Sequence, residues 1–521
     1  MKPSTCKAIA AGTVVAAITL LFFILAPASP RAIAALTVER VAPAEAENST
    51  VRLWGGYVID TGHGVWGDGT GNIYTCGSTE SFAPMWLAMV LVKWNSEGNQ
   101  IWNRTWGEIY DVGRAVWGDG KGSIYTCGST DRDTKSVDLL LVKWDIEGNQ
   151  LWNRTWGGAA VDEGAAVWGD GTGSIYTCGD TYSFSAGGND LVLVKWDSDG
   201  YQIWNRTWGG IKWDQGYGVW GDGTGIIYTC GSTMSFGSGG YDVVLVNYDS
   251  LGNQLWNRTW GGIQDDYGNA VWGDGKGSIY TCGDTCCYGA GENDMVLIKW
   301  NSAGNQVWNR TWGGSAVDEG SAVWGDGAGS IYTCGSTDSY GAGYSDIILV
   351  KWDAAGNRLW NGTWGGPAND VGNAMWGIGK YIYICGCTYS YGSGDTDMVL
   401  WFSELYTPIP TSSIVGIIVL IGVVAIAITL GIARYKKLPH RVKERARREP
   451  WVYKIRRRPK VKEIVYRRPE THAPEKSMSP PLVGACQNCG QRFPAGFERA
   501  AFCPYCGHAT KQTSDKTEIK L

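Results

Sequence analysis

The sequence predicts an all-β fold made of seven copies of one four-stranded unit. A Trp-Gly-Gly motif, or a close variant of it, recurs seven times at intervals of 50 or 52 residues. The composition, with 75 Gly and 29 Trp among 521 residues, is typical of short strands joined by tight turns and packed with large side chains. The motif begins at Trp54, Trp106, Trp156, Trp208, Trp260, Trp312 and Trp364.

The unit from Trp260 to Trp312 shows why four strands are expected in each copy. Residues 269–273 and 278–283 are short β-type runs, and the Asp-Gly-Lys-Gly sequence between them is a strong hairpin signal. A third run covers residues 294–300, and an Asn- and Gly-containing turn leads from it into a fourth run at 306–312. Four antiparallel strands, repeated seven times, predict a seven-bladed β-propeller.

The two ends of the repeat region predict how the ring closes. The seventh unit has three strand-like runs, at residues 373–376, 381–386 and 397–402, and then enters a Thr-Pro-Ile-Pro sequence. Residues 49–54 align with the missing fourth run. We therefore expect an N-terminal strand to complete the last blade of a propeller that covers residues 48–405, which leaves no interrupted sheet edge.

At these motifs the chain resembles the bacterial and archaeal β-propeller repeat family. The matching segments in the fifth unit are Asp266-Tyr267-Gly268, 274–285, 294–299 and 304–308, and the resemblance covers about residues 49–402. It implies a secreted or cell-surface location. It implies no shared reaction or ligand, since one fold serves many functions.

Two apolar segments predict that the propeller lies outside the cell. Residues 1–35 contain a run from 8 to 26 after two lysines, followed by small-residue tripeptides, which indicates a signal peptide or an uncleaved signal anchor. Residues 414–433 are uncharged and long enough to span a bilayer, so we expect a transmembrane helix at 412–434. The basic residues that follow predict a cytoplasmic tail in a protein of the cell membrane.

The tail is expected to hold a basic linker and a small zinc domain. From residue 434 onward, 22 Lys and Arg face 8 Asp and Glu. The Pro-containing linker at 435–484 is expected to contact anionic lipid headgroups; nucleic-acid contact is a weaker interpretation, and a solvated tether remains open. Residues 485–510 resemble the zinc-ribbon family over about 485–508, and residues 511–521 form a disordered tail. The predicted ligands of one structural zinc ion are Cys486, Cys489, Cys503 and Cys506. A closed site of this kind favours a cytoplasmic protein partner.

Cysteine and the aromatic residues also repeat with the blades. The second strand of each unit carries one cysteine, and we interpret these thiols as buried apolar filler, because equivalent positions in neighbouring blades lie too far apart for disulfides. The unrepeated Cys286, Cys287 and Cys387 are better disulfide candidates. Repeated tryptophans could stack on sugars, but packing between blades is favoured. The repeated cysteines are Cys76, Cys127, Cys178, Cys230, Cys282, Cys334 and Cys385.

Each first strand opens with an aspartate. These carboxylates could form a ring at one mouth of the central channel and attract calcium. The favoured interpretation is local, with each side chain accepting backbone N–H bonds in its own turn. The residues are Asp60, Asp111, Asp162, Asp214, Asp266, Asp318 and Asp370.

Each unit also carries an asparagine in a glycosylation sequon. The fourth strand is expected to be the exposed one, so glycans on the rim of the propeller and a simple ladder of polar side chains are equally consistent with the sequence. The asparagines are Asn48, Asn103, Asn153, Asn205, Asn257, Asn309 and Asn361.

The loops between the second and third strands vary from unit to unit, whereas the turns between the first and second strands stay uniform. Variable loops on a rigid scaffold usually carry recognition, so we expect this face to bind an extracellular protein or carbohydrate.

Only one of the four histidines, His63, lies in the repeats, which excludes a repeated His-based catalytic or metal centre there. We therefore expect a non-enzymatic binding or scaffolding protein. The alternatives are a surface polysaccharide hydrolase or lyase, which a carboxylate pair in a cleft would favour, and a glycosylated envelope component.

Overall fold

The computed structural model describes residues 49–131 and 136–404. Within these ranges the regular structure consists of strands, arranged as seven four-stranded antiparallel sheets. No helix in this part of the chain has the length and apolar character needed to cross a membrane. The predicted segments 1–35, 412–434, 435–484, 485–510 and 511–521 lie outside the described residues.

The sheets are named blades 1 to 7 in chain order. Blade 1 contains β2 (Asp60–Gly67), β3 (Ile73–Thr79), β4 (Ala88–Trp94) and β5 (Gln100–Trp106). Blade 2 contains β6 (Asp111–Gly118), β7 (Ser123–Thr130), β8 (Asp138–Asp145) and β9 (Gln150–Trp156). Blade 3 contains β10 (Asp162–Gly169), β11 (Ile175–Thr181), β12 (Asp190–Trp196) and β13 (Gln202–Trp208). Blade 4 contains β14 (Asp214–Gly221), β15 (Ile227–Thr233), β16 (Asp242–Tyr248) and β17 (Gln254–Trp260).

The remaining blades follow the same order until the last one. Blade 5 contains β18 (Asp266–Gly273), β19 (Ser278–Thr285), β20 (Asp294–Asn301) and β21 (Gln306–Trp312). Blade 6 contains β22 (Asp318–Gly325), β23 (Ile331–Thr337), β24 (Asp346–Trp352) and β25 (Arg358–Trp364). Blade 7 contains β26 (Asp370–Ile378), β27 (Tyr381–Thr388), β28 (Asp397–Glu404) and β1 (Ser49–Trp54).

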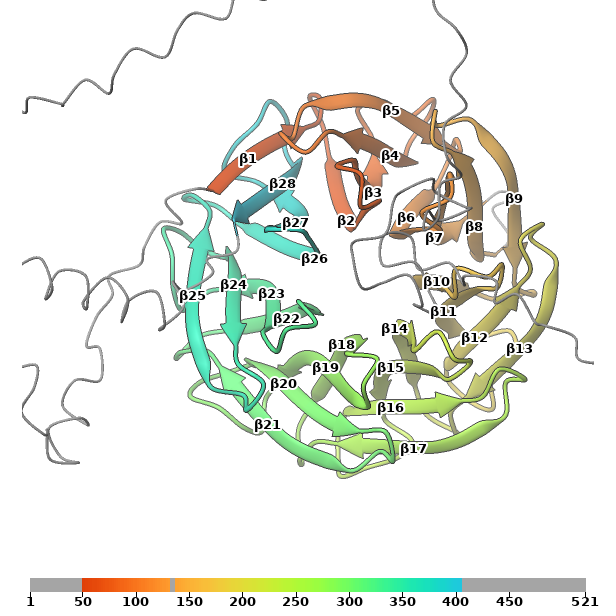
Figure 1. The fold of residues 1–521 in the computed structure, drawn as a ribbon, viewed down its shortest axis with the longest axis vertical. Helices are drawn as coiled ribbons and strands as arrows, with labels where there is room; N and C mark the ends of the chain where they lie inside the picture. Colours follow the sequence, from red (N-terminus) through yellow and green to blue (C-terminus); the bar gives the residue numbers. More distant parts are fainter. Residues whose placement is uncertain (1–48, 132–135, 405–521) are drawn as a thin grey trace, which may run out of the picture. The chain divides into compact units, whose positions relative to one another are not determined.

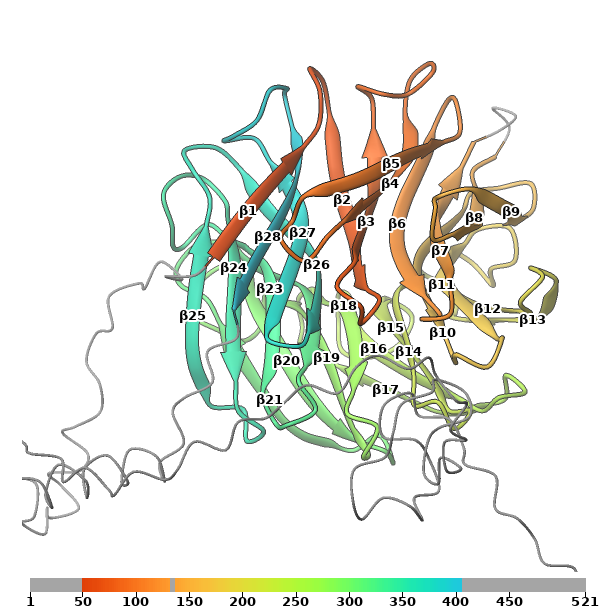
Figure 2. The same cartoon turned by 45° about the horizontal axis from the view of Figure 1, so that its top comes forward.

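The blades form a ring in which the first strand of each blade lies nearest the central axis and the fourth lies outermost (Figure 1). Blade 7 is closed by the N-terminal strand, as predicted. β1 pairs antiparallel with β28 along its whole length, from Ser49 opposite Ser403 to Trp54 opposite Met398. Figure 2 shows β1 running along the outer side of β28. The predicted seven-bladed propeller is thus confirmed in blade number, strand number and closure.

The hydrophobic core is divided among the boundaries between blades. One cluster combines Tyr280, Cys282 and Leu297 of blade 5 with Ile331 and Val350 of blade 6, and the other boundaries repeat this arrangement. The two middle strands of each blade are covered on both faces, which explains their nearly continuous apolar sequences. The predicted packing role of the repeated tryptophans is confirmed.

A bulge interrupts the first strand of every blade at one repeat position. In blade 5 the pairing of β18 with β19 shifts between Gly268 and Ala270, so Asn269 is the extra residue. This place, called here the bulge position, is occupied by six different residue types in the seven blades. Its occupants are His63, Arg114, Ala165, Tyr217, Asn269, Ser321 and Asn373.

Candidate binding face

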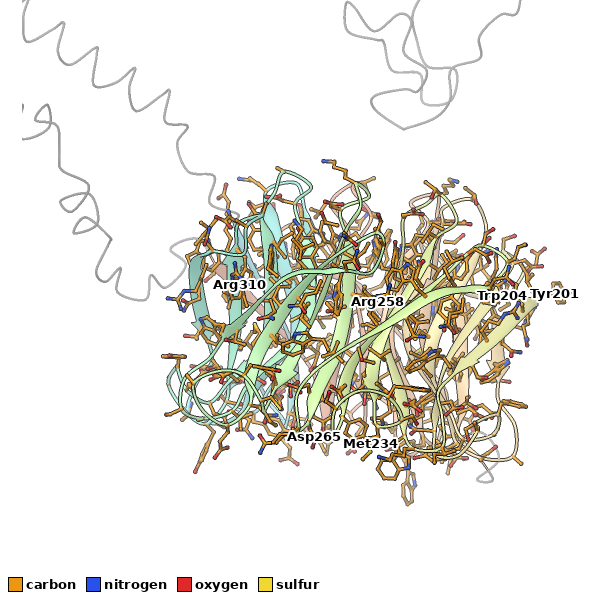
Figure 3. All side chains as sticks on the ribbon, turned by 90° about the horizontal axis from the view of Figure 1, so that it is seen from below. Tyr201, Trp204, Met234, Arg258, Asp265 and Arg310 are labelled. Atoms are coloured by element: carbon orange, nitrogen blue, oxygen red, sulfur yellow. The ribbon has the colours of Figure 1, made fainter. Side chains whose placement is uncertain are left out.

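The predicted variable loops gather at one end of the propeller, called here the variable-loop face. It consists of the connections from second to third strands and the turns from fourth to first strands. Backbone hydrogen bonds tie the two sets together, as from Tyr182 N to Val161 O at 2.9 Å and from Met234 N to Trp213 O at 2.8 Å. Figure 3 shows Met234 and Asp265 near the same edge of the molecule, away from Tyr201 in a turn of the opposite face.

Exposed apolar side chains are concentrated on this face. Tyr57, Ile211 and Ile263, at equivalent places in three of the turns, are 88%, 83% and 86% exposed, and the loop residues Trp86 and Tyr344 are 73% and 75% exposed. In the described turns of the opposite face, the exposed large apolar side chains are Ile146, Tyr201 and Leu251. Six more are exposed beside these turns, at the second residue of the outermost strands: Ile101, Leu151, Ile203, Leu255, Val307 and Leu359. The loops and turns of the variable-loop face therefore expose more large apolar side chains than the turns of the opposite face do.

Aromatic pairs anchor the variable loops to the sheets. In six blades the tryptophan of the Trp-Gly-Gly motif contacts an aromatic residue of the following loop, with ring centroids 5.0–5.5 Å apart. This packing fixes the base of each loop, so the exposed side chains beyond it are held on rigid supports. The pairs are Trp54–Phe82, Trp156–Phe184, Trp208–Phe236, Trp260–Tyr288, Trp312–Tyr340 and Trp364–Tyr391.

The seven aspartates that open the first strands serve their own turns. All are buried, with at most 4% of their surface exposed. One carboxylate oxygen of Asp162 accepts a hydrogen bond from Gly158 N at 2.7 Å, and the other accepts one from the Thr181 hydroxyl. The local interpretation is thereby confirmed. In the described part of the chain, no three acidic, His or Cys side chains come together as a metal site would require.

The predicted glycosylation sites lie on the outermost strands. Asn103, Asn153, Asn205, Asn257, Asn309 and Asn361 occupy β5, β9, β13, β17, β21 and β25, all at least partly exposed. Asn48 and the four predicted zinc ligands, Cys486, Cys489, Cys503 and Cys506, lie outside the described residues.

The ten cysteines of the described ranges are all free. The seven repeated ones are at most 1% exposed, and burial raises the pKa of each thiol, as expected for inert filler. The expectation of a disulfide among the unrepeated cysteines is wrong. Cys387 is buried in β27 of blade 7, whereas Cys286 and Cys287 lie in a loop of blade 5, where the Cys286 thiol donates to Asn293 Oδ1 at 2.7 Å.

A shallow pocket of about 490 Å³ opens on the variable-loop face. It brings together two carboxylates, because Glu163 of β10 stands directly opposite Asp180 of β11. Asn189 Nδ2 donates to Asp180 Oδ2 at 2.8 Å. The lining residues are Ala160, Val161, Glu163, Asp180, Tyr182, Asn189 and Gln215.

The environment of Asp180 disfavours its charged form. Burial, followed by the charges of Glu163 and Asp162, raises the pKa of Asp180 to about 6, against the opposing effects of the Asn189 hydrogen bond and the Arg114 charge. The sequence pattern alone did not predict this pair. Its signal was a departure from the repeat, since four blades have serine where blade 3 has Asp180.

No protein-family model and no curated protein matches the chain. Its fold is similar to that of the WD40 β-propeller domain of Doa1, with 11% identity, a TM-score of 0.41, and coverage of 68% of this chain and 95% of that one. It is also similar to the β-propeller domain of the Trilobed protease from Pyrococcus furiosus, with 10% identity, a TM-score of 0.38, and coverage of 70% and 97%. The periplasmic gluconolactonase PpgL of Pseudomonas aeruginosa gives 10% identity, a TM-score of 0.38, and coverage of 59% and 87%.

Proposed function

We propose that this chain is a single-pass protein of the cell surface, and that its extracellular propeller binds or scaffolds another protein through the variable-loop face. The observation that carries the proposal is the concentration of exposed apolar side chains on that face, including Tyr57, Ile211 and Ile263. Large apolar side chains gathered on one face in this way mark interaction sites, because their contact with water is unfavourable. The aromatic anchors beneath the loops support a preformed binding surface.

The sequence supplies the remaining parts of the proposal. The uncharged stretch at 414–433, within the predicted helix at 412–434, anchors the protein, and the basic residues after it keep the tail in the cytoplasm. A zinc ribbon at 485–510 then offers an internal protein partner a folded surface. Protease added to intact cells should remove the propeller and leave the tail; a protected propeller would contradict this topology.

The binding face is tested with matched surface variants of the full-length chain. One variant replaces Tyr57, Ile211 and Ile263 by serine; the control makes the same change at Ile146, Tyr201 and Leu251 of the opposite face. Photo-crosslinking in membranes of the native host should give a product of defined mass that the first variant loses and the control keeps. Equal crosslinking by both variants would show that the variable-loop face is not the binding surface.

A second candidate function, surface polysaccharide hydrolysis or elimination, is favoured by one observation. Glu163 and Asp180 form a carboxylate pair in the pocket, and the raised pKa of Asp180 is what a general acid requires. Release of new reducing ends from a panel of polysaccharides, abolished by Glu163→Gln and by Asp180→Asn, would support an enzyme. Release that persists in both variants, or none from any polysaccharide, would exclude this site as a catalytic pair.

A further inference from the structure

Two blades carry the same aspartate and asparagine at equivalent positions, and they differ in how the side chains are satisfied. In blade 5, Asp284 accepts hydrogen bonds on both oxygens, from Asn269 Nδ2 at 3.2 Å and from Asn293 Nδ2 at 3.0 Å. The remaining oxygen of the group, Asn293 Oδ1, accepts from the Cys286 thiol at 2.7 Å. The side-chain oxygens of Asp284 and Asn293 therefore all have donors.

In blade 3 the corresponding donors are missing. Asp180 and Asn189 correspond to Asp284 and Asn293, but Ala165 occupies the bulge position in place of Asn269, and Tyr182 replaces Cys286. No group of the described residues donates to Asp180 Oδ1, whereas Asn189 Nδ2 bonds the other oxygen. Asn189 is only 2% exposed, and its Oδ1 has no hydrogen-bond partner. A buried acceptor without a donor is costly, so Asn189 Oδ1 calls for a donor that the described residues do not supply.

The surroundings of these acceptors are negative and aromatic. Glu163 lies opposite Asp180 in the same pocket, and Tyr182, 44% exposed, forms part of its wall. Tyr217, at the bulge position of blade 4, is close enough to both carboxylates for their charges to raise the pKa of its hydroxyl, after the larger effect of burial. The opposing positive charge is that of Arg114, at the bulge position of blade 2.

We propose that the pocket at Glu163, Asp180 and Asn189 binds an organic cation, either an ammonium or a guanidinium group. Such a group donates several hydrogen bonds, relieves the repulsion between two neighbouring carboxylates, and interacts favourably with tyrosine faces. A divalent metal ion fits less well, because no three acidic, His or Cys side chains of the described ranges are grouped to hold one. The inference goes beyond the proposed function, since a small cation can be bound without any protein partner.

Binding should depend on pH, because the cation requires the charged form of Asp180. The titratable and charged groups around this carboxylate are Glu163 and Asp162 of β10, Cys178 of β11, Arg114 of β6, Tyr217 of β14 and Tyr241 of the loop before β16, and Asn189 donates to it. Since the pKa of Asp180 lies at about 6, affinity for the cation should be highest at a pH well above 6. It should weaken as the pH falls through that value.

The test is isothermal titration of the full-length chain with blocked amino acids. Nα-acetyl-lysine amide and Nα-acetyl-arginine amide represent the side chains of a partner, cadaverine represents a free amine, and Nα-acetyl-norleucine amide is the uncharged control. At least one cationic probe should show saturable binding, and the norleucine probe should show none. Tighter binding of a blocked amino acid than of cadaverine would identify a protein side chain as the natural occupant, and the reverse would identify a free amine.

Three variants locate the site. Asp180→Asn should weaken binding at least tenfold, and Ala165→Asn should do the same by placing in blade 3 the amide that seals Asp284 in blade 5. Asp284→Asn is the matched control and should leave affinity unchanged, with the thermal midpoint of each variant reporting whether it folds. Absence of cation binding, equal binding of the norleucine probe, affinity unaffected by both blade 3 changes, or calcium binding that displaces the cation would each overturn the proposal.

Discussion

Aspartate is ordinarily an exposed residue, but many aspartate side chains of this protein are buried. The sequence was sufficient to predict the role of those in the Asp-x-Gly turns, because their acceptors serve donors only a few residues away, as with Gly158 N and Asp162. It was not sufficient for Asp180. Its environment depends on Glu163, on Asn189 and on Ala165, which come together through strand pairing and a bulge rather than through sequence proximity.

Asp284 should make the stability of the propeller depend on pH. Burial is the main cause that raises its pKa from 3.8 to about 7, followed by the charge of Glu319. The folded state therefore holds this proton more tightly than the unfolded state, so its contribution to stability is complete below about 3.8 and is lost as the pH rises through about 7. Asp284→Ser introduces the residue that four other blades have at this position. Across that range the variant should gain in thermal midpoint relative to the original chain; a difference independent of pH would contradict this account.

The outermost strands link each blade to the next through arginine. In blade 3, Arg206 Nε and Nη2 donate to the carbonyl oxygens of Gly252 and Leu251, in the turn between the third and fourth strands of blade 4, at 2.8 and 2.9 Å. Arg258 and Arg310 occupy the same position on the outer surface (Figure 3). The N-terminal strand continues the pattern, because Arg52 Nη2 donates to Glu97 O of blade 1 at 2.9 Å.

Blade 6 lacks this arginine, and the blade that follows it has no turn whose carbonyl oxygens could accept the hydrogen bonds. Blade 7 has no turn between its third and fourth strands, since β28 and β1 belong to opposite ends of the repeat region. Blade 6, which precedes it, has Gly362 where five other blades have arginine on a continuous strand. The Asn-Gly-Thr sequence was visible as a departure from Asn-Arg-Thr, but its reason required the position of the turns in the ring.

Removal of one rim arginine should therefore loosen one boundary between blades. Arg206→Ala should cost roughly 1 to 2 kcal/mol, because it removes charge-assisted hydrogen bonds at a partly exposed site. Arg358→Ala, at the exposed start of β25, is the control and should be nearly neutral. Denaturant unfolding of the variants measures both changes. Gly362→Arg should bring no gain in stability; a clear gain would mean that blade 7 does offer acceptors there.

At the scale of the whole molecule, the repeat count and the incomplete seventh unit were enough to predict the ring and its closure. Both features follow from local sequence patterns that recur, so every blade gives the same evidence for a four-stranded unit. The binding pocket follows from differences between blades, and a repeat analysis averages such differences away. Blades 3 and 5 share Asp180 and Asp284 as a departure from serine, yet only their three-dimensional neighbours distinguish an open site from a sealed one.

Closure of the ring by β1 should control its cooperativity. A chain lacking residues 1–54 loses the strand that covers β28, which leaves an unpaired edge and an exposed side of blade 7. It should unfold at a lower temperature, in a broader transition, and associate through that edge. A chain lacking only residues 1–48 keeps the strand and should behave as the intact propeller does. Equal thermal transitions in the two chains would show that β1 is dispensable.

The predicted zinc ribbon and the propeller should respond independently to chelation. We expect one zinc ion per full-length chain by elemental analysis, lost in Cys486→Ser, because four thiolates are needed for a closed tetrahedral site. A chelator should abolish the structure of the tail region, as judged by proteolysis, and leave the melting of the propeller unchanged. Zinc content that survives loss of Cys486 would contradict the predicted ligand set.

The pairing of Ser49 with Ser403 makes the contact between β1 and β28 weak against a force that pulls the two strand ends apart. Ser49 at the start of β1 and Ser403 near the end of β28 lie side by side, because the two strands run in opposite directions. A tension that separated these strand ends would break the hydrogen bonds between β1 and β28 one after another, starting at Ser49 and ending at Trp54, instead of loading them all together. Force applied at both strand ends should thus unzip the ring at this seam, whereas an anchor on one of them alone leaves it unloaded.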